Sequence, residues 1–223
     1  MRDLPAPLPP EKRTVGQLVG ESIRAYSSNF WRALLLGLPL AAISQVTVGR
    51  HINVQLLILT AAAPLLSATY VWAVVLVSPG PVSRNAAIRA YVVGVLVWIP
   101  APFLLRLYIL PMLAWLAFFG LAVPAALNED LGVRAALARA RQLAKAGYAH
   151  ALGSLCTLVI VFGISAGVLG VLLQGQAHNT LRVAGFLVML VLSPLIFLGS
   201  AILYFDQAAR VQVGSPGPNE GCR

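Results

Sequence analysis

Long apolar runs separated by short polar stretches dominate the pattern of this chain. An α-helix rises about 1.5 Å per residue and the hydrocarbon core of a bilayer is about 30 Å thick, so runs of about 20 apolar residues are typical of membrane-spanning helices. The pattern predicts an all-α fold, a polytopic membrane helical bundle of about six transmembrane helices. The predicted spans are residues 33–49, 54–78, 91–105, 107–127, 151–173 and 182–205.

The region from residue 91 to 127 admits two interpretations because Arg106 interrupts its apolar sequence. One long span would bury Arg106 in lipid and would divide the 16 Lys and Arg residues into eight on one side, seven on the other and one buried. Two spans divide them 13 to three, so we predict two. The first, residues 91–105, is short and contains Pro100 and Pro102, which makes a re-entrant segment its alternative.

Positive charge is sorted between the two faces of this six-span arrangement. Only Arg50, Arg106 and Arg182 fall on one face, and the other 13 basic residues fall with all seven acids on the opposite face. Lys and Arg concentrate in the cytoplasmic loops of membrane proteins. The sorting therefore predicts a multi-pass protein of the cytoplasmic (plasma) membrane with both termini in the cytoplasm.

Two amphipathic segments precede spans. After Thr14, which forms a capping box with Gln17, apolar residues recur at spacings of three and four: Val15, Leu18, Val19, Ile23, Tyr26 and Phe30. A second segment, residues 131–148, carries basic residues on one face, namely Arg134, Arg141 and Lys145. We expect both to be cytoplasmic entry helices, the second with its basic residues as contacts for lipid headgroups.

Composition agrees with a membrane protein. Apolar residues make up 59% of the chain, charged residues only 10%, and the mean hydropathy is +0.83. Residues 14–210 then form one membrane domain, flanked by a Pro-rich tail over 1–13 and a polar tail over 211–223, both expected to be disordered. The net charge of +9 lies in short groups rather than in one stripe, which favours anionic lipid headgroups over nucleic acid as partner. A protein partner is the alternative.

Three segments carry a resemblance to a known family. Residues 15–32 include an Asn29-Phe30 pair before the first span, residues 123–129 and 135–148 form a second entry, and residues 204–210 open with Tyr204-Phe-Asp. In this order they resemble the bacterial glycerophosphoryl diester phosphodiesterase membrane domain-like family. The resemblance implies a multi-span helical domain in a bacterium, which in some relatives is joined to a phosphodiesterase domain. Such a catalytic domain is missing from this sequence.

Motifs for catalysis are absent from the sequence. Zincin His-Glu spacing, a phosphate-cradling Gly loop and a nucleophile elbow do not occur, so we predict no catalytic residue, no cofactor and no metal. One polar cluster remains at the inner ends of the predicted spans: Glu129, His150, Asp206 and Arg210. It is a candidate proton or headgroup site, but a local pair between Asp206 and Arg210, four residues apart, is the simpler interpretation.

Small residues and prolines are the last features of note. Gly163, Gly167 and Gly170 lie one turn apart, and such spacing lets helix backbones pack closely, within one chain or between two. We predict a non-enzymatic integral membrane protein that acts through lipid or protein contacts at its basic inner face. The prolines in the spans favour the alternative, a transporter or flippase-like protein for an apolar or amphiphilic substrate.

Overall fold

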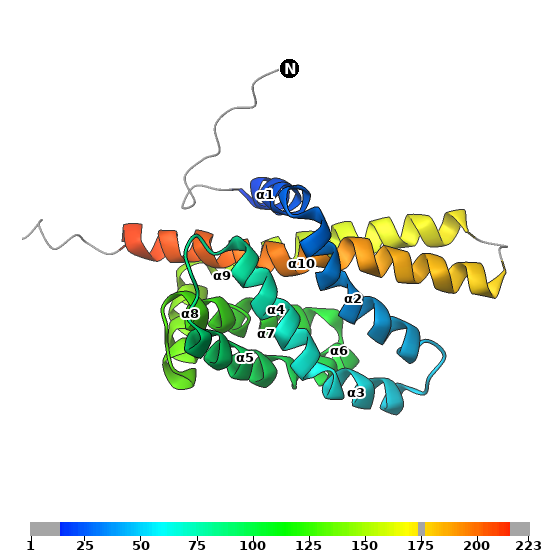
Figure 1. Ribbon diagram of the computed structural model, residues 1–223, viewed down its shortest axis with the longest axis horizontal. Helices are drawn as coiled ribbons and strands as arrows, with labels where there is room; N and C mark the ends of the chain where they lie inside the picture. The colour runs from blue at the N-terminus through cyan, green and yellow to red at the C-terminus, as the bar shows by residue number, and fades with distance from the viewer. Residues whose placement is uncertain (1–13, 174–176, 215–223) are drawn as a thin grey trace, which may run out of the picture.

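The computed structural model describes residues 14–173 and 177–214, and the regular structure of this part is helical throughout (Figure 1). Of the two predicted tails, residues 1–13 and residues 215–223 lie outside the described residues, whereas residues 211–214 of the second tail are helical. The helices are α1 (Val15–Ser28), α2 (Phe30–Thr47), α3 (Ile52–Ala61), α4 (Ala63–Val77), α5 (Arg84–Trp98), α6 (Ala101–Leu107), α7 (Ile109–Phe119), α8 (Ala122–Asn128), α9 (Val133–Leu172) and α10 (His178–Gly214).

Five stretches of these helices are long and apolar enough to cross a membrane, and a bent pair of helices makes a sixth if the pair forms one span. This confirms the predicted helical membrane bundle. The five are Phe30–Thr47, Arg84–Leu107, Ile109–Asn128, Gly147–Leu172 and Asn179–Val211, and the bent pair joins Ile52–Ala61 to Ala63–Val77. The protein is therefore a multi-pass integral membrane protein.

Three of the spans are broken rather than straight. The second bends by 49° at Ala62, next to Pro64 in the first turn of α4. The third runs from α5 into α6 across Pro100, and the fourth from α7 into α8 across Gly120. Proline lacks the N–H that an unbroken helix requires. The prolines in the spans favour such breaks, whereas apolar runs alone do not reveal them.

The third span begins earlier than its apolar run. Residues 91–105 were expected to cross, whereas the helix starts at Arg84, where the Ser83 hydroxyl accepts from the backbone N–H of Ala86 at 3.1 Å. The prediction left the start of this helix outside the span because Arg84 and Arg89 are charged, and charged side chains are rarely buried in lipid. Similarly, α10 continues to Gly214, past residue 210 where the membrane domain was expected to end.

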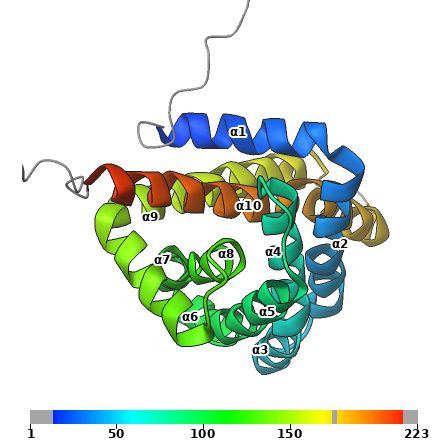
Figure 2. The ribbon, with the colours of Figure 1, turned by 60° about the vertical axis from the view of Figure 1, so that its left-hand side comes forward.

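Helix α1 lies across α10 and α9 (Figure 2). The backbone N–H of Thr14 donates to Gln17 Oε1 at 2.9 Å, as the capping pattern predicts. Leu18 and Ser22 are fully buried, and they meet α10 at Gly199, where an added Cβ would lie 2.6 Å from Leu158 and 3.0 Å from the Ser22 hydroxyl. A glycine at this crossing lets three helices meet.

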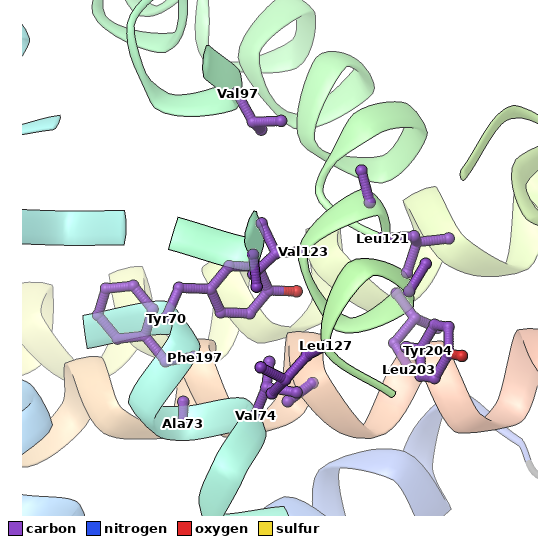
Figure 3. Close-up of a cluster of buried hydrophobic side chains, with 14 of the residues drawn as sticks. Tyr70, Ala73, Val74, Val97, Leu121, Val123, Leu127, Phe197, Leu203 and Tyr204 are labelled. Carbon is purple, nitrogen blue, oxygen red and sulfur yellow. The ribbon is translucent and has the colours of Figure 1, made fainter. Parts of the chain in front are cut away.

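The interior is packed from all parts of the bundle. Tyr70 of α4 and Phe197 of α10 have ring centroids 6.4 Å apart, and both belong to the buried cluster drawn in Figure 3. The Ser67 hydroxyl donates to the Tyr91 carbonyl at 2.7 Å and so links α4 to α5. Because lipid removes most of the hydrophobic drive between helices, such contacts and close packing hold the bundle together.

Helices α9 and α10 form a hairpin that extends beyond the other helices (Figure 1). The part of the hairpin farthest from the other helices exposes apolar side chains on all sides, among them Ile164, Val168, Val171 and Val183. Gly163, Gly167 and Gly170 lie exposed on this part of α9, and an added Cβ would meet nothing within 4 Å at any of them. In the described chain these three glycines are therefore not contacts between helices.

Candidate functional site

The polar residues gather at one end of the bundle, which we call the charged end and define by Glu129, Arg139, His150 and Arg210. At its centre, both carboxylate oxygens of Glu129 accept from Arg139 Nε at 3.0 Å. The hydroxyl of Tyr204 donates to Glu129 Oε1 at 2.8 Å. The three residues come from the α8–α9 loop, α9 and α10, so one carboxylate ties three elements together.

A second arginine holds the same loop from the other side. Arg89 of α5 donates to the backbone carbonyl of Asp130 at 3.0 Å and to its carboxylate at 3.2 Å. Asp130 has a φ of +50°, the left-handed region that aspartate tolerates better than most residues. The loop between α8 and α9 is thus fixed by an arginine on each of its two acids.

Helix α9 breaks at Gly147, and α10 supplies the side chain that fills the break. Gly147 has φ −163° and ψ 47°, outside the helical region. The amide of Gln207, which is fully buried, donates to the Gly147 carbonyl at 3.4 Å. A Cβ at residue 147 would lie only 2.7 Å from Gln207 Oε1, so glycine permits this approach. The break turns residues 133–146 away from the span Gly147–Leu172 (Figure 2).

The structure brings two residues of the predicted polar cluster together, His150 and Arg210. Glu129 belongs to the group with Arg139 and Tyr204, whereas His150 Nε2 lies 3.4 Å from Arg210 Nη2. A guanidinium only donates, so this contact is a hydrogen bond when His150 Nε2 carries no proton. Asp206 is fully buried on α10, one turn before Arg210.

Arg134, Arg141 and Lys145 are exposed on one face of residues 133–146. The opposite face packs into the bundle through residues that are fully buried: Ala136, Ala140, Leu143 and Ala144. Arg141 also lies over the ring of Phe119, 5.7 Å from its centroid. Arg139 points to another side, toward Glu129, which is why it does not belong to the basic face.

Tyr204, Arg139 and Gln207 were not among the predicted site residues. Tyr204 carried one signal, its place in the Tyr204-Phe-Asp motif, but its partner Glu129 lies 75 residues away in the chain. Gln207 and Gly147 are 60 residues apart. Pairings over such separations follow from the helix arrangement and leave no local pattern in the sequence.

An apolar cavity of about 230 Å³ lies inside the bundle. Eight helices contribute to its wall, which includes Leu40, Leu59, Leu105, Leu155 and Phe197. Polar atoms come from Tyr70, Trp98 and Ser200, and the Ser200 hydroxyl donates to the Ile196 carbonyl at 2.7 Å. The indole N–H of Trp98 is buried and has no acceptor among the residues that the structure describes.

The end opposite the charged end holds two of the arginines that were predicted on the other face, Arg50 and Arg182. Arg50 and Arg182 line one hollow there, and Gln45 of α2 donates to the Arg182 carbonyl at 3.1 Å. Over the described ranges, 14–173 and 177–214, no three His, Cys, Asp or Glu side chains are grouped so as to hold a metal ion. Comparisons of the chain with models of protein families, with curated proteins and with solved structures found no match.

Proposed function

We propose that this integral membrane protein belongs to a bacterial cytoplasmic membrane and acts without catalysis, by binding anionic lipid headgroups at its charged end. Arg134, Arg141 and Lys145 would make the contacts. The resemblance to the phosphodiesterase membrane domain-like family supports the bacterial assignment. The geometry of residues 133–146 supports the lipid contact, because this helix lies at the end of the bundle with its basic face outward.

The pairing of the nearby acids carries this proposal. Glu129 is held by Arg139, and Asp130 by Arg89. Arg134, Arg141 and Lys145 are therefore left as an excess of positive charge on an exposed face. Each basic residue near an anionic membrane surface contributes about 1 kcal/mol, and salt weakens this attraction.

The experiment compares two triple variants that remove the same charge. Arg134→Gln, Arg141→Gln and Lys145→Gln together should lower the enrichment of phosphatidylglycerol around the protein in mixed-lipid nanodiscs by up to about 100-fold at low salt. Arg50→Gln, Arg106→Gln and Arg182→Gln should leave it nearly unchanged. Lipid extraction and mass spectrometry give the readout. Unchanged enrichment in the first variant, or an equal loss in both, would refute the proposal.

Transport of an apolar or amphiphilic substrate is the second candidate. The observation that favours it is the set of breaks at Ala62, Pro100 and Gly120, since transporters place substrate sites beside broken helices. The cavity borders two of these breaks through Ala101 and Gly120. Flux of labelled amphiphiles into reconstituted vesicles distinguishes transport from headgroup binding, which requires none.

A further inference from the structure

Two arginines at the end opposite the charged end line one hollow. The hollow has a volume of about 540 Å³, and Arg50 of the α2–α3 loop and Arg182 of α10 both contribute to its wall. The span Phe30–Thr47 ends just before Arg50. Arg182 lies in the first turn of the span Asn179–Val211. The hollow is therefore at the ends of two spans, the level at which lipid headgroups lie.

Glutamines hold the backbone at both arginines. The side-chain amide of Gln55 in α3 donates to the Arg50 carbonyl at 3.0 Å. Gln45 of α2 donates to the Arg182 carbonyl at 3.1 Å. Between α2 and Arg50 the chain turns at Gly49, whose φ of +73° is in the left-handed region that favours glycine. Because the backbone is held, only the two arginine side chains need to become ordered when a ligand binds.

The positive charge of this hollow is not neutralised by the part of the chain that the structure describes. Neither arginine forms an ion pair there. Asp206 is on the same helix as Arg182, but it lies about 36 Å further along at 1.5 Å per residue. The other described acids are on α1 or in the α8–α9 loop. Two guanidinium groups without an acid attract an anion, and their paired N–H donors match the oxygens of a phosphate.

A more apolar hollow adjoins the first. It has a volume of about 330 Å³ and shares Gln45 and Arg182 with its neighbour. Val183 and Phe186 of α10 add apolar wall, and Val183 is 60% exposed. Both residues belong to the span Asn179–Val211, so this wall continues toward the hydrocarbon of the bilayer. A phospholipid joins a phosphate to acyl chains, so it matches the two hollows together, whereas a free anion matches only the first.

We propose that Arg50 and Arg182 bind the phosphate of one phospholipid in the leaflet at this end, with an acyl chain over Val183 and Phe186. Every phospholipid carries this phosphate, so the site adds no preference for phosphatidylglycerol. The result expected for the triple variant of Arg50, Arg106 and Arg182 therefore does not change. The site is separate from the basic face of residues 133–146, so either proposal can fail alone.

The experiment compares a lipid that carries a phosphate with one that lacks it. The background protein contains Arg134→Gln, Arg141→Gln and Lys145→Gln, which remove the basic face of residues 133–146 as a competing site. In dodecyl maltoside, it should bind its first dioleoyl-phosphatidylcholine roughly tenfold more tightly than dioleoylglycerol, the lower end for hydrogen bonds to charged groups. Lipid titration followed by native mass spectrometry measures both affinities.

Single substitutions in this background locate the site. Arg50→Gln and Arg182→Gln should each remove most of the preference for the phosphate, and both replace exposed side chains, so the fold should persist. Arg106→Gln is the matched control, because Arg106 belongs to the same predicted face but lines neither hollow. It should keep the preference. No preference in the background protein, or equal effects of the three substitutions, would overturn the proposal. Displacement of the bound lipid by excess inorganic phosphate would also overturn it and would assign the hollow to the free anion.

Discussion

Tyr204 shows how single polar groups organise the charged end. Its hydroxyl reaches Glu129, which Arg139 holds from α9, while the following turn of α10 places Gln207 at the break in α9. A buried or half-buried carboxylate is stable in such a place only when donors surround it. The position of residues 133–146 at the charged end thus depends on a few side chains of α10.

The first prediction concerns the hydroxyl of Tyr204. Tyr204→Phe should reduce the free energy of unfolding by about 1.5 kcal/mol, the lower end for a hydrogen bond to a charged group, because Arg139 still pairs with Glu129. Tyr91→Phe, at a residue that is 37% exposed, should change it by less than about 0.5 kcal/mol. Denaturant titration in detergent measures both. An equal effect of the two substitutions would show that the Tyr204 hydroxyl has no special role.

At the scale of elements, a glycine that packs against the α9–α10 hairpin and a glycine on the hairpin act in opposite ways. Gly37 of α2 faces the backbone of Leu190 in α10 so closely that a Cβ there would overlap the Leu190 carbonyl. Gly167 of α9 faces open space. Close helix packing in the membrane therefore rests on Gly37 and on Gly199, neither of which belongs to a GxxxG pattern.

The prediction at this scale compares the same substitution, glycine to alanine, at Gly37 and at Gly167. Gly37→Ala should lower the free energy of unfolding by about 1–3 kcal/mol, since the added methyl overpacks a backbone contact. Gly167→Ala should raise it by about 0.5–1 kcal/mol, because alanine has the better helix propensity and meets no neighbour. Thermal unfolding in detergent tests the pair. A loss at Gly167 as large as that at Gly37 would mean that another surface covers the hairpin.

How far the sequence predicts the elements depends on what each one contacts. Span positions and the two amphipathic helices follow from apolar periodicity, so residues 182–205 and all but the last two of residues 33–49 fall inside observed helices. The break at Gly147, in contrast, depends on a contact with Gln207, 60 residues away in the chain. Periodicity likewise puts Arg134, Arg141 and Lys145 on one helix face, and all three are exposed. It does not reveal that Arg139 meets Glu129.

For the whole molecule, the two ends of the bundle differ in charge. Arg89 pairs with Asp130 at the charged end, whereas Arg50 and Arg182 line a hollow at the other. Helices α3 and α4 connect Arg50 to Arg89, so we infer that this bent pair crosses the membrane. Counted with this pair, the crossings would number six, and an even number would put both termini on one side.

The last prediction tests this orientation. In a background with Cys156→Ser and Cys222→Ser, a membrane-impermeant maleimide added to intact cells should label Arg182→Cys but leave Arg134→Cys unlabelled until lysis. Both side chains are exposed in the structure, so labelling after lysis controls for reactivity. The expectation rests on the excess of Lys and Arg at the charged end, because Lys and Arg concentrate in the cytoplasmic loops of membrane proteins. The reverse pattern would invert the protein and put residues 133–146 beyond the reach of cytoplasmic anionic lipid, and equal labelling of both in intact cells would contradict six crossings.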